Sequence, residues 1–272
     1  MRIIVAGPPK TGNIWIKCLL SQVYNLEVLY RPPQTDVAFN RAVQDGWFPD
    51  GSIFHQHFAP TPLFLETTST LNCTLVTIIR NPYDAFVSLY YFVQNFPKQF
   101  APNATQWLPK PLRNYFVRNF PKRFARAYNP LHRIYGKPID HPEVLAFIRD
   151  TSGGYGIHLL SAKNWLESGR SIILRYEDLK AAPARALGEV AAQIQAVDES
   201  ALQSAVETCG AENMRKIFKR YRKHIREGKV GDWRNHLTAA HLEALKTHAL
   251  WIEALGYEVF EPELADPEAR KP

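Results

Sequence analysis

An apolar strand that runs into a Gly/Pro turn and then into a helix is the feature that most constrains this fold. Residues 3–6 are a short, largely β-branched run, and a Gly-Pro-Pro turn at residues 7–9 closes it. Residues 14–23 continue without Gly or Pro, which favours a helix. A buried strand, a tight turn and a helix in this order are typical of α/β proteins.

The same order recurs further along the chain. Residues 75–79 predict a second strand and residues 83–93 the helix after it, while residues 171–174 predict a third strand. We therefore expect an α/β fold with a central parallel sheet flanked by helices, similar to the P-loop nucleotide-binding folds. In such open sheets ligands bind at the edge where the strands end.

Length and composition fit one domain of residues 1–272. The chain is 46% apolar and 22% charged, so a sizeable core is available. Residues 95–145 differ from the rest: eight prolines lie between Pro97 and Pro142, among many aromatic side chains. We expect this segment to form a lid or an acceptor wall. Peripheral helices rich in alanine and leucine are expected at residues 182–196 and 239–255.

The turn after the first strand has the setting of a phosphate-binding loop. Backbone N–H groups at a helix N-terminus bind oxyanions, and Gly7 and Gly12 keep the five-residue offset of the nucleotide-triphosphate loop. In that loop a Lys and a hydroxyl residue come next, and the hydroxyl binds Mg²⁺. Here Asn13 and Ile14 stand there, and Lys10 lies inside the loop. The sequence predicts a phosphate site without a metal ligand, although a solvated turn fits this segment equally well.

Two further segments bear on that choice. Residues 80–88 lie at another strand-to-helix junction, where Arg80 offers a planar fork to a phosphate and Ser88 offers a hydroxyl. Asp84 has a local alternative role as a cap or as an ion-pair partner of Arg80. Residues 226–234 form a basic segment with glycines, which by itself predicts a solvated surface loop.

Together these motifs resemble the cytosolic-type sulfotransferases that use 3′-phosphoadenosine 5′-phosphosulfate (PAPS). Residues 9–15 are similar to the family's P-K-S-G-T-T-W loop, and residues 80–88 match its R-N-P-x-D-x-x-V-S motif in full. Residues 176–179 are similar to its Y-E-D segment, and residues 226–234 to its R-K-G-x-x-G-D-W-K tail. The short chain is most similar in kind to bacterial small-molecule enzymes.

The resemblance implies PAPS as co-substrate, adenosine 3′,5′-bisphosphate (PAP) as product, and no metal. It implies that the 5′-phosphosulfate and the adenine are bound by Lys10, Thr11, Gly12, Asn13 and Trp15. It implies that the 3′-phosphate and the adenine base are bound by Arg80, Ser88, Arg226, Gly228 and Tyr176.

The chain also departs from the family pattern. Ile14 replaces a hydroxyl residue of the loop, and Ala211 replaces a phenylalanine that packs on the adenine. The family's dimer motif is only echoed, so a homodimer is weakly implied. The residues of that echo are Arg234, Thr238, Ala239 and Glu243.

A histidine pair is expected to supply the chemistry. His57 matches by position the base of the family's K-x-H-x-P motif, and His55 falls where the family has a lysine that assists at the sulfonate. In an extended segment the two would share one face, and two surface histidines are the alternative. His57 would take the proton from a hydroxyl or amine of a small-molecule acceptor that attacks sulfur in line. Lys10, with His55 when charged, would neutralise the developing charge.

The charge balance keeps two other classes open. The net charge of +7 favours anionic partners, and basic zones lie at residues 118–133 and 215–223. A P-loop nucleotide or small-molecule kinase is one alternative, and a basic protein that binds nucleic acid or another polyanion is the second. We expect no specific nucleic acid as partner. The acceptor itself stays open between phenols, sterols, polyketide alcohols, sugars and acidic molecules.

Cysteine usage and the N-terminus predict a cytoplasmic setting. Cys18, Cys73 and Cys209 are far apart and form no Cys-x-x-Cys motif, so we expect neither a zinc site nor a disulfide. The first residues do not resemble a targeting segment, and no stretch has the length of a membrane span.

Overall fold

The computed structural model describes residues 1–95, 112, 130–210, 212–213 and 228–262. Contacts divide the chain into two compact units. Unit 1 comprises Met1–Ala85, His158–Gly231 and Leu250–Glu258, and unit 2 comprises Phe86–Ile157, Asp232–Ala249 and Val259–Pro272. Most of the expected acceptor wall at residues 95–145 lies outside the described residues. Its role stays a prediction, as does the single domain.

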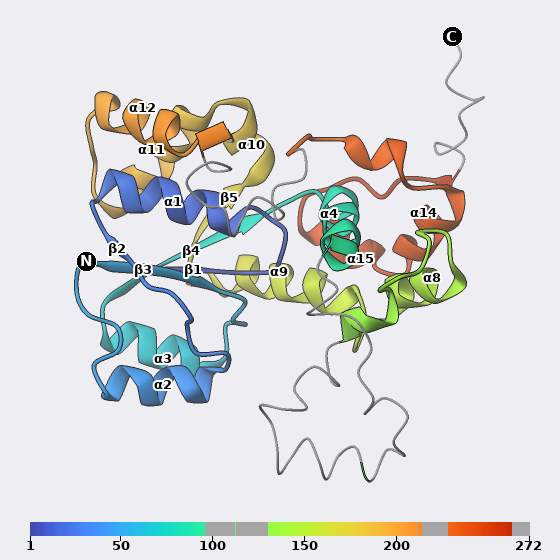
Figure 1. The fold of residues 1–272 in the computed structure, drawn as a ribbon, viewed down its shortest axis with the longest axis horizontal. Coiled ribbons are helices and arrows are strands. Elements are labelled where there is room, and N and C mark those ends of the chain that lie inside the picture. Colours follow the sequence, from blue (N-terminus) through green and yellow to red (C-terminus); the bar gives the residue numbers. More distant parts are fainter. Residues whose placement is uncertain (96–111, 113–129, 211, 214–227, 263–272) are drawn as a thin grey trace. The chain divides into compact units, whose positions relative to one another are not determined.

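A five-stranded parallel sheet forms the centre of unit 1 (Figure 1). Its strands are β1 (Arg2–Ala6), β2 (Glu27–Val28), β3 (Ser52–Gln56), β4 (Cys73–Ile79) and β5 (Ile172–Arg175). They lie in the order β2-β3-β1-β4-β5, and each neighbouring pair is parallel. The predicted α/β class is confirmed, with the three predicted strands found as β1, β4 and β5. The short β2 and the partly polar β3 lack the continuous apolar run that marks a buried strand in the sequence.

Helices cover both faces of this sheet (Figure 1). One face carries α1 (Asn13–Val23), α11 (Pro183–Ile194) and α12 (Glu199–Thr208), and the other carries α2 (Asp36–Gln44) and α3 (Pro62–Thr70). Alternation along β1 produces this arrangement. Ile3 and Val5 pack in the cluster under α1, whereas Ile4 and Ala6 pack with the aromatic cluster that includes Phe39. A strand that is covered on both faces is apolar throughout.

The order of the strands determines where a ligand can bind. The chain leaves β1 for β2 and β3 on one side of it, and then for β4 and β5 on the other. The loops after β1, β3 and β4 therefore meet at the carboxyl edge of the sheet, around the point where the strand order reverses. That is the binding position in open α/β sheets.

The remaining described helices differ from the sequence prediction at one place. They are α4 (Pro82–Asn95), η3 (Pro130–Arg133), α8 (Pro142–Arg149), α9 (Gly156–Ser168), α10 (Tyr176–Ala181), η4 (Asp232–Asn235), α14 (Ala239–Lys246) and α15 (Ala249–Ala254). The prediction of one helix at residues 239–255 is wrong, because the helix is interrupted between α14 and α15. There His248 is buried, and its Nε2 lies 2.6 Å from the carbonyl oxygen of Ile148. No Gly or Pro marks this break in the sequence.

Within the described part of the chain, no helix is both long enough and apolar enough to cross a bilayer.

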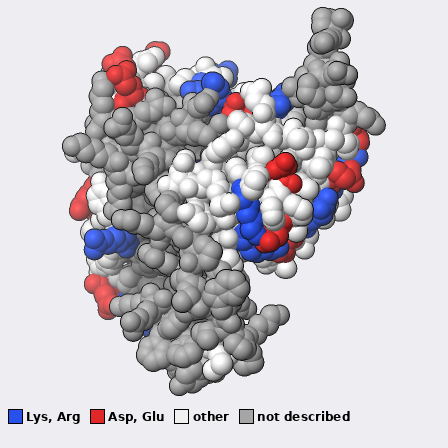
Figure 2. Space-filling view, turned by 45° about the vertical axis from the view of Figure 1, so that its right-hand side comes forward, with Lys and Arg blue, Asp and Glu red and all other residues white. Residues whose placement is uncertain are grey.

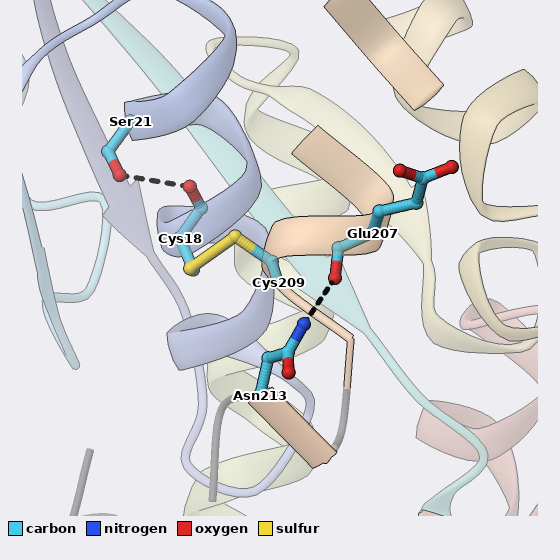
Figure 3. Close-up of a disulfide and its surroundings, with 5 residues drawn as sticks. All are labelled: Cys18, Ser21, Glu207, Cys209 and Asn213. Atoms are coloured by element: carbon cyan, nitrogen blue, oxygen red, sulfur yellow. Dashed lines mark hydrogen bonds between the residues drawn. A yellow bond between two sulfur atoms is a disulfide. The ribbon is translucent and has the colours of Figure 1, made fainter. Parts of the chain in front are cut away.

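A disulfide joins Cys18 of α1 to Cys209, which caps the C-terminus of α12 (Figure 3). The expectation that the chain forms no disulfide is therefore wrong. The two cysteines are 191 positions apart in the sequence, so no local spacing indicates the pair, and only the fold packs α1 and α12 on the same face of the sheet. Both cysteines are buried, so the bond is enclosed in the core. Cys73 is free, and burial raises the pKa of its thiol to about 12.

The cross-link predicts a stability that depends on redox state. Because the bond closes a long loop in the unfolded chain, Cys209→Ser should lower the free energy of unfolding by about 2–5 kcal/mol. Thermal unfolding with and without a thiol reductant measures the effect. The Tm of the wild type should fall in reductant, and that of C209S should not respond. Cys73→Ser is the control and should keep the redox response. Identical Tm values for oxidised and reduced wild type would contradict the bond.

Candidate active site

The predicted phosphate loop between β1 and α1 is held together by hydrogen bonds from its own side chains. The Thr11 hydroxyl donates to the carbonyl oxygen of Pro8 at 3.0 Å, and the Asn13 amide donates to the same oxygen at 2.8 Å. Gly12 caps α1 in the left-handed region, with φ at 116°. These bonds hold the turn in shape, so the backbone N–H groups at the start of α1 are the donors that an anion can use.

Lys10 adds a cation to the same turn. Its φ of 69° is unusual for a residue with a side chain, which marks a tightly constrained loop. Burial and the neighbouring charge of Arg80 lower the pKa of Lys10 to about 8. Two cations this close are stabilised by an anion, so the electrostatics of the turn favour a phosphate-like ligand.

Arg80 connects three of the motifs that the sequence analysis singled out. Its Nη1 donates to the carbonyl oxygen of Lys10 at 3.3 Å, and its Nη2 to that of Lys229 at 3.1 Å. Its guanidinium carbon lies 4.3 Å from the centre of the Tyr176 ring. Among the described residues, the buried Nε of Arg80 has no hydrogen-bond partner. A guanidinium that is anchored at one end and has a buried donor left over suits an anionic ligand.

Tyr176 completes this cluster. It follows β5 as the first residue of α10, and its hydroxyl donates to the carbonyl oxygen of Gly228 at 3.2 Å. The Trp15 ring meets it edge-on, with 6.1 Å between the ring centres. A Cβ at Gly12 would lie 2.9 Å from the Tyr176 ring, so only glycine fits there. The structure thus brings together Trp15, Gly12, Arg80, Tyr176 and Gly228.

Two carboxylates hold the surrounding loops in place. Asp84 accepts a hydrogen bond from the backbone N–H of Gly231 at 2.6 Å. Glu177 accepts one from the N–H of Asn81 at 2.8 Å and another from the Tyr257 hydroxyl at 2.8 Å. Asp84 therefore connects the motif of residues 80–88 with the C-terminal glycine segment, a longer-range role than the local one that the sequence suggested.

Two predicted nucleotide residues are not placed with this cluster. Ser88 lies in α4, in the part that belongs to unit 2. Arg226 lies outside the described residues. Their roles at the 3′-phosphate stay predictions.

His57 is anchored to the phosphate loop by one ring nitrogen. Its Nδ1 lies 2.9 Å from the carbonyl oxygen of Gly7. A carbonyl only accepts, so Nδ1 carries the proton and Nε2 keeps its lone pair. The residue is exposed, yet the surrounding protein desolvates its ring enough to lower its pKa, and the charge of Lys10 acts in the same direction. His57 is therefore a neutral imidazole near neutral pH, as a general base must be.

The second predicted histidine lies beside the first. His55 belongs to β3, so the extended conformation predicted for this segment is found there, and His57 lies one residue beyond the end of the strand at Gln56. Their ring centres are 6.2 Å apart.

A third histidine lies close to this pair. His158, in the first turn of α9, is near enough to His57 for the two rings to interact electrostatically. Burial and, after it, the neighbouring His57 lower the pKa of His158 to about 4, so it stays neutral. No motif or spacing indicates it, because α9 reaches β3 only through the tertiary fold.

Comparison with known proteins agrees with the geometry. The sulfotransferase domain family matches residues 1–250, so the chain belongs to the sulfotransferase family. Cytosolic sulfotransferase 13 of Arabidopsis thaliana is 23% identical over 270 residues, which cover 87% of this chain and 72% of the relative. Mouse sulfotransferase SULT7A1, solved with PAP, is 15% identical with a TM-score of 0.63, over 94% of this chain and 89% of that one.

A second solved structure shows the same fold. Retinol dehydratase, in complex with androsterone and inactive cofactor PAP, is 15% identical with a TM-score of 0.54. The match covers 96% of this chain and 83% of that chain.

The close approach of Gly12 to Tyr176 predicts that one methyl group added at position 12 lowers the stability of the protein strongly. Gly12→Ala adds an overlap with the ring and a left-handed strain, and should lower the free energy of unfolding by about 2–4 kcal/mol. Gly169→Ala is the matched control, since it shares a positive φ of 61° with nothing near its Cβ, and should cost about 1 kcal/mol. Urea unfolding measures both. Equal losses in the two variants would show that the close contact is absent.

Proposed function

We propose that this sulfotransferase transfers the sulfonate group of PAPS to a hydroxyl or amine of a small-molecule acceptor and releases PAP. The proposal rests mainly on two side chains, Arg80 and His57, that are hydrogen-bonded to the same loop. Arg80 is bonded to the loop at Lys10, and the base His57 is bonded to it at Gly7. An anion bound to the loop would therefore lie within reach of both.

The donor would be held by the residues of this cluster. The N-terminus of α1 and Lys10 suit the 5′-phosphosulfate, and the leftover Nε of Arg80 suits the additional 3′-phosphate. Trp15 and Tyr176 offer aromatic faces to the adenine. Two solved relatives bound PAP, which supports a bisphosphate nucleotide at this site.

The transfer needs one proton acceptor and one charge stabiliser. The acceptor oxygen or nitrogen attacks sulfur while its proton passes to Nε2 of His57. The bond between sulfur and the bridging oxygen breaks, and its electron pair leaves with PAP, whose phosphate is a good leaving group. Lys10 would stabilise the charge that grows on this phosphate, and His55 would assist when protonated.

The two alternative classes have less support. In the kinase loop a hydroxyl residue binds Mg²⁺, but here Ile14 has none and the amide of Asn13 donates to Pro8. Of the basic zones, residues 118–129 and 215–223 lie outside the described residues. On the face drawn in Figure 2, described Lys and Arg side chains are interspersed with Asp and Glu. Among the described residues, ion pairs join Arg133 to Asp150 and Lys137 to Glu143. A mixed surface does not favour a polyanion.

A transfer assay tests the proposal most directly. Purified protein is incubated with ³⁵S-labelled PAPS, EDTA and a panel of phenols, alcohols, amines and glycans. Labelled product should form in EDTA, with one PAP released for each sulfonate transferred. No product from any acceptor, together with phosphoryl transfer from ATP and Mg²⁺, would favour the kinase instead.

The base assignment predicts separate effects on turnover and on binding. His57→Ala should lower kcat by about 10²–10⁴-fold, because it removes the proposed proton acceptor. His57→Asn is the matched variant, since its amide can still donate to the Gly7 carbonyl but cannot act as a base. Both should bind PAP within about threefold of wild type, as measured by calorimetry. Substantial kcat in His57→Asn would contradict the role of His57.

The lowered pKa of Lys10 predicts proton uptake on donor binding. Only protonated Lys10 attracts the phosphate, and its pKa of about 8 in the free protein must rise when the anion binds. At pH 8.5 about a quarter of Lys10 is already protonated, so PAP binding should take up about 0.5–0.75 proton, and affinity should fall as pH rises through 8. Calorimetry in buffers of different ionisation enthalpy counts the protons. Lys10→Met should abolish the uptake, and an unchanged proton count in this variant would exclude Lys10 as its source.

A further inference from the structure

Tyr257 is a partly buried residue that the proposed transfer reaction does not use. It follows α15 and lies beyond residues 1–250, which the sulfotransferase domain family matches. Its hydroxyl donates to Oε2 of Glu177 at 2.8 Å. Burial and the Glu177 carboxylate raise the pKa of Tyr257, so the hydroxyl keeps its proton and is the donor in this bond. Because Glu177 directly follows Tyr176, the bond connects Tyr257 with the cluster around Arg80.

The Arg175 side chain holds Tyr257 in place. Its Nη2 donates to the carbonyl oxygen of Leu255 at 2.9 Å, and its guanidinium carbon lies 5.0 Å from the centre of the Tyr257 ring. A Cβ at Gly256 would lie 2.7 Å from Nη2 of Arg175, so the chain passes close to this side chain. Arg175 is the last residue of β5. The Tyr257 hydroxyl is therefore fixed relative to the central sheet.

The Glu177 carboxylate connects Tyr257 with the segment that carries Arg80. Its Oε1 accepts a hydrogen bond from the backbone N–H of Asn81 at 2.8 Å, while Oε2 accepts the bond from Tyr257. A carboxylate that is bonded at both oxygens has a fixed orientation. Glu177, Asn81, Arg80 and Tyr257 all belong to unit 1.

Arg80 leaves β4 beside the residues that follow β5. The two strands are parallel neighbours and end at the same level, so the next two residues of each leave the sheet together. At the first position the Arg80 guanidinium carbon lies 4.3 Å from the centre of the Tyr176 ring, and at the second Asn81 bonds to Glu177. A shift of Glu177 would therefore change the path of the chain directly after Arg80 and turn its guanidinium.

We propose that Tyr257 is a positioning residue for the 3′-phosphate of the donor: through Glu177 and the backbone of Asn81, it holds Arg80 in the orientation that binds this phosphate. The inference rests on the proposed function, in which Arg80 meets the 3′-phosphate, and adds a residue that no motif includes. The loop assigned to the 5′-phosphosulfate is held by its own bonds from Thr11 and Asn13. Loss of the Tyr257 hydroxyl should therefore affect the 3′-phosphate selectively.

The preference for a 3′-phosphate tests this role. Calorimetric titrations with PAP and with adenosine 5′-monophosphate, both in EDTA, give the ratio of the two affinities, in which effects on the shared groups cancel. Tyr257→Phe removes the hydroxyl and keeps the ring against which Arg175 packs. The variant should lower the ratio about three- to tenfold, while its affinity for adenosine 5′-monophosphate stays within about twofold of wild type.

Tyr24→Phe is the matched control. The Tyr24 hydroxyl donates to the carbonyl oxygen of Gln195 at 2.8 Å, so this variant also loses one hydrogen bond of unit 1. It should keep the wild-type ratio of affinities. An equal fall of the ratio in Tyr24→Phe and Tyr257→Phe would show a general structural effect and would overturn the inference.

Two variants of Glu177 test the connection itself and do not depend on the stability of Tyr257→Phe. Glu177→Gln and Glu177→Ala remove the same charge, but only the amide can still bond to the Asn81 N–H and the Tyr257 hydroxyl. The ratio should be at least about threefold lower in Glu177→Ala than in Glu177→Gln. Adding Tyr257→Phe to Glu177→Ala should change the ratio by less than about 1.5-fold, because the two residues act as one unit.

Each result decides for or against the positioning role. A wild-type ratio in Tyr257→Phe, equal ratios in the two Glu177 variants, or an undiminished effect of Tyr257→Phe in the Glu177→Ala background would contradict it. Failure of the proposed function looks different, since the wild type would then bind PAP no more tightly than adenosine 5′-monophosphate.

Discussion

The turn between β1 and α1 is the constraint on which the rest of the site depends. It lies at the carboxyl end of the central strand, and the left-handed Gly12 lets the turn pass directly beneath the Tyr176 ring. The carbonyl oxygens of the same turn anchor Arg80 and His57. One loop thus sets the positions of a helix N-terminus, a guanidinium and an imidazole. A change in its path would move all three together.

Electrostatics explain why these groups occur together. Lys10 and Arg80 repel each other, and Lys10 also lowers the pKa of His57. Without an anion this arrangement costs stability, and it is typical of sites that bind a highly charged ligand. Burial and the same field lower the pKa of His57, as the proposed role of a base requires.

Much of this arrangement could be predicted from the sequence, because the decisive motifs are local. Strand-to-turn-to-helix junctions mark β1 and β4, and the residues that follow them include Lys10 and Arg80. Features that depend on tertiary packing could not be predicted. The Cys18–Cys209 bond joins helices that are distant in the chain, and the break before α15 carries no Gly or Pro. His158 belongs to no motif, and only the packing of α9 brings it near His57.

The central claim is that this loop, with Arg80, binds a nucleotide bearing phosphates at both the 5′ and 3′ positions. Calorimetric titration of the wild-type protein with PAP and with adenosine 5′-monophosphate, both in EDTA, tests it directly. The account predicts that PAP binds at least tenfold more tightly, and that Arg80→Met removes most of this difference. Equal affinity for the two nucleotides, or binding of neither, would contradict it.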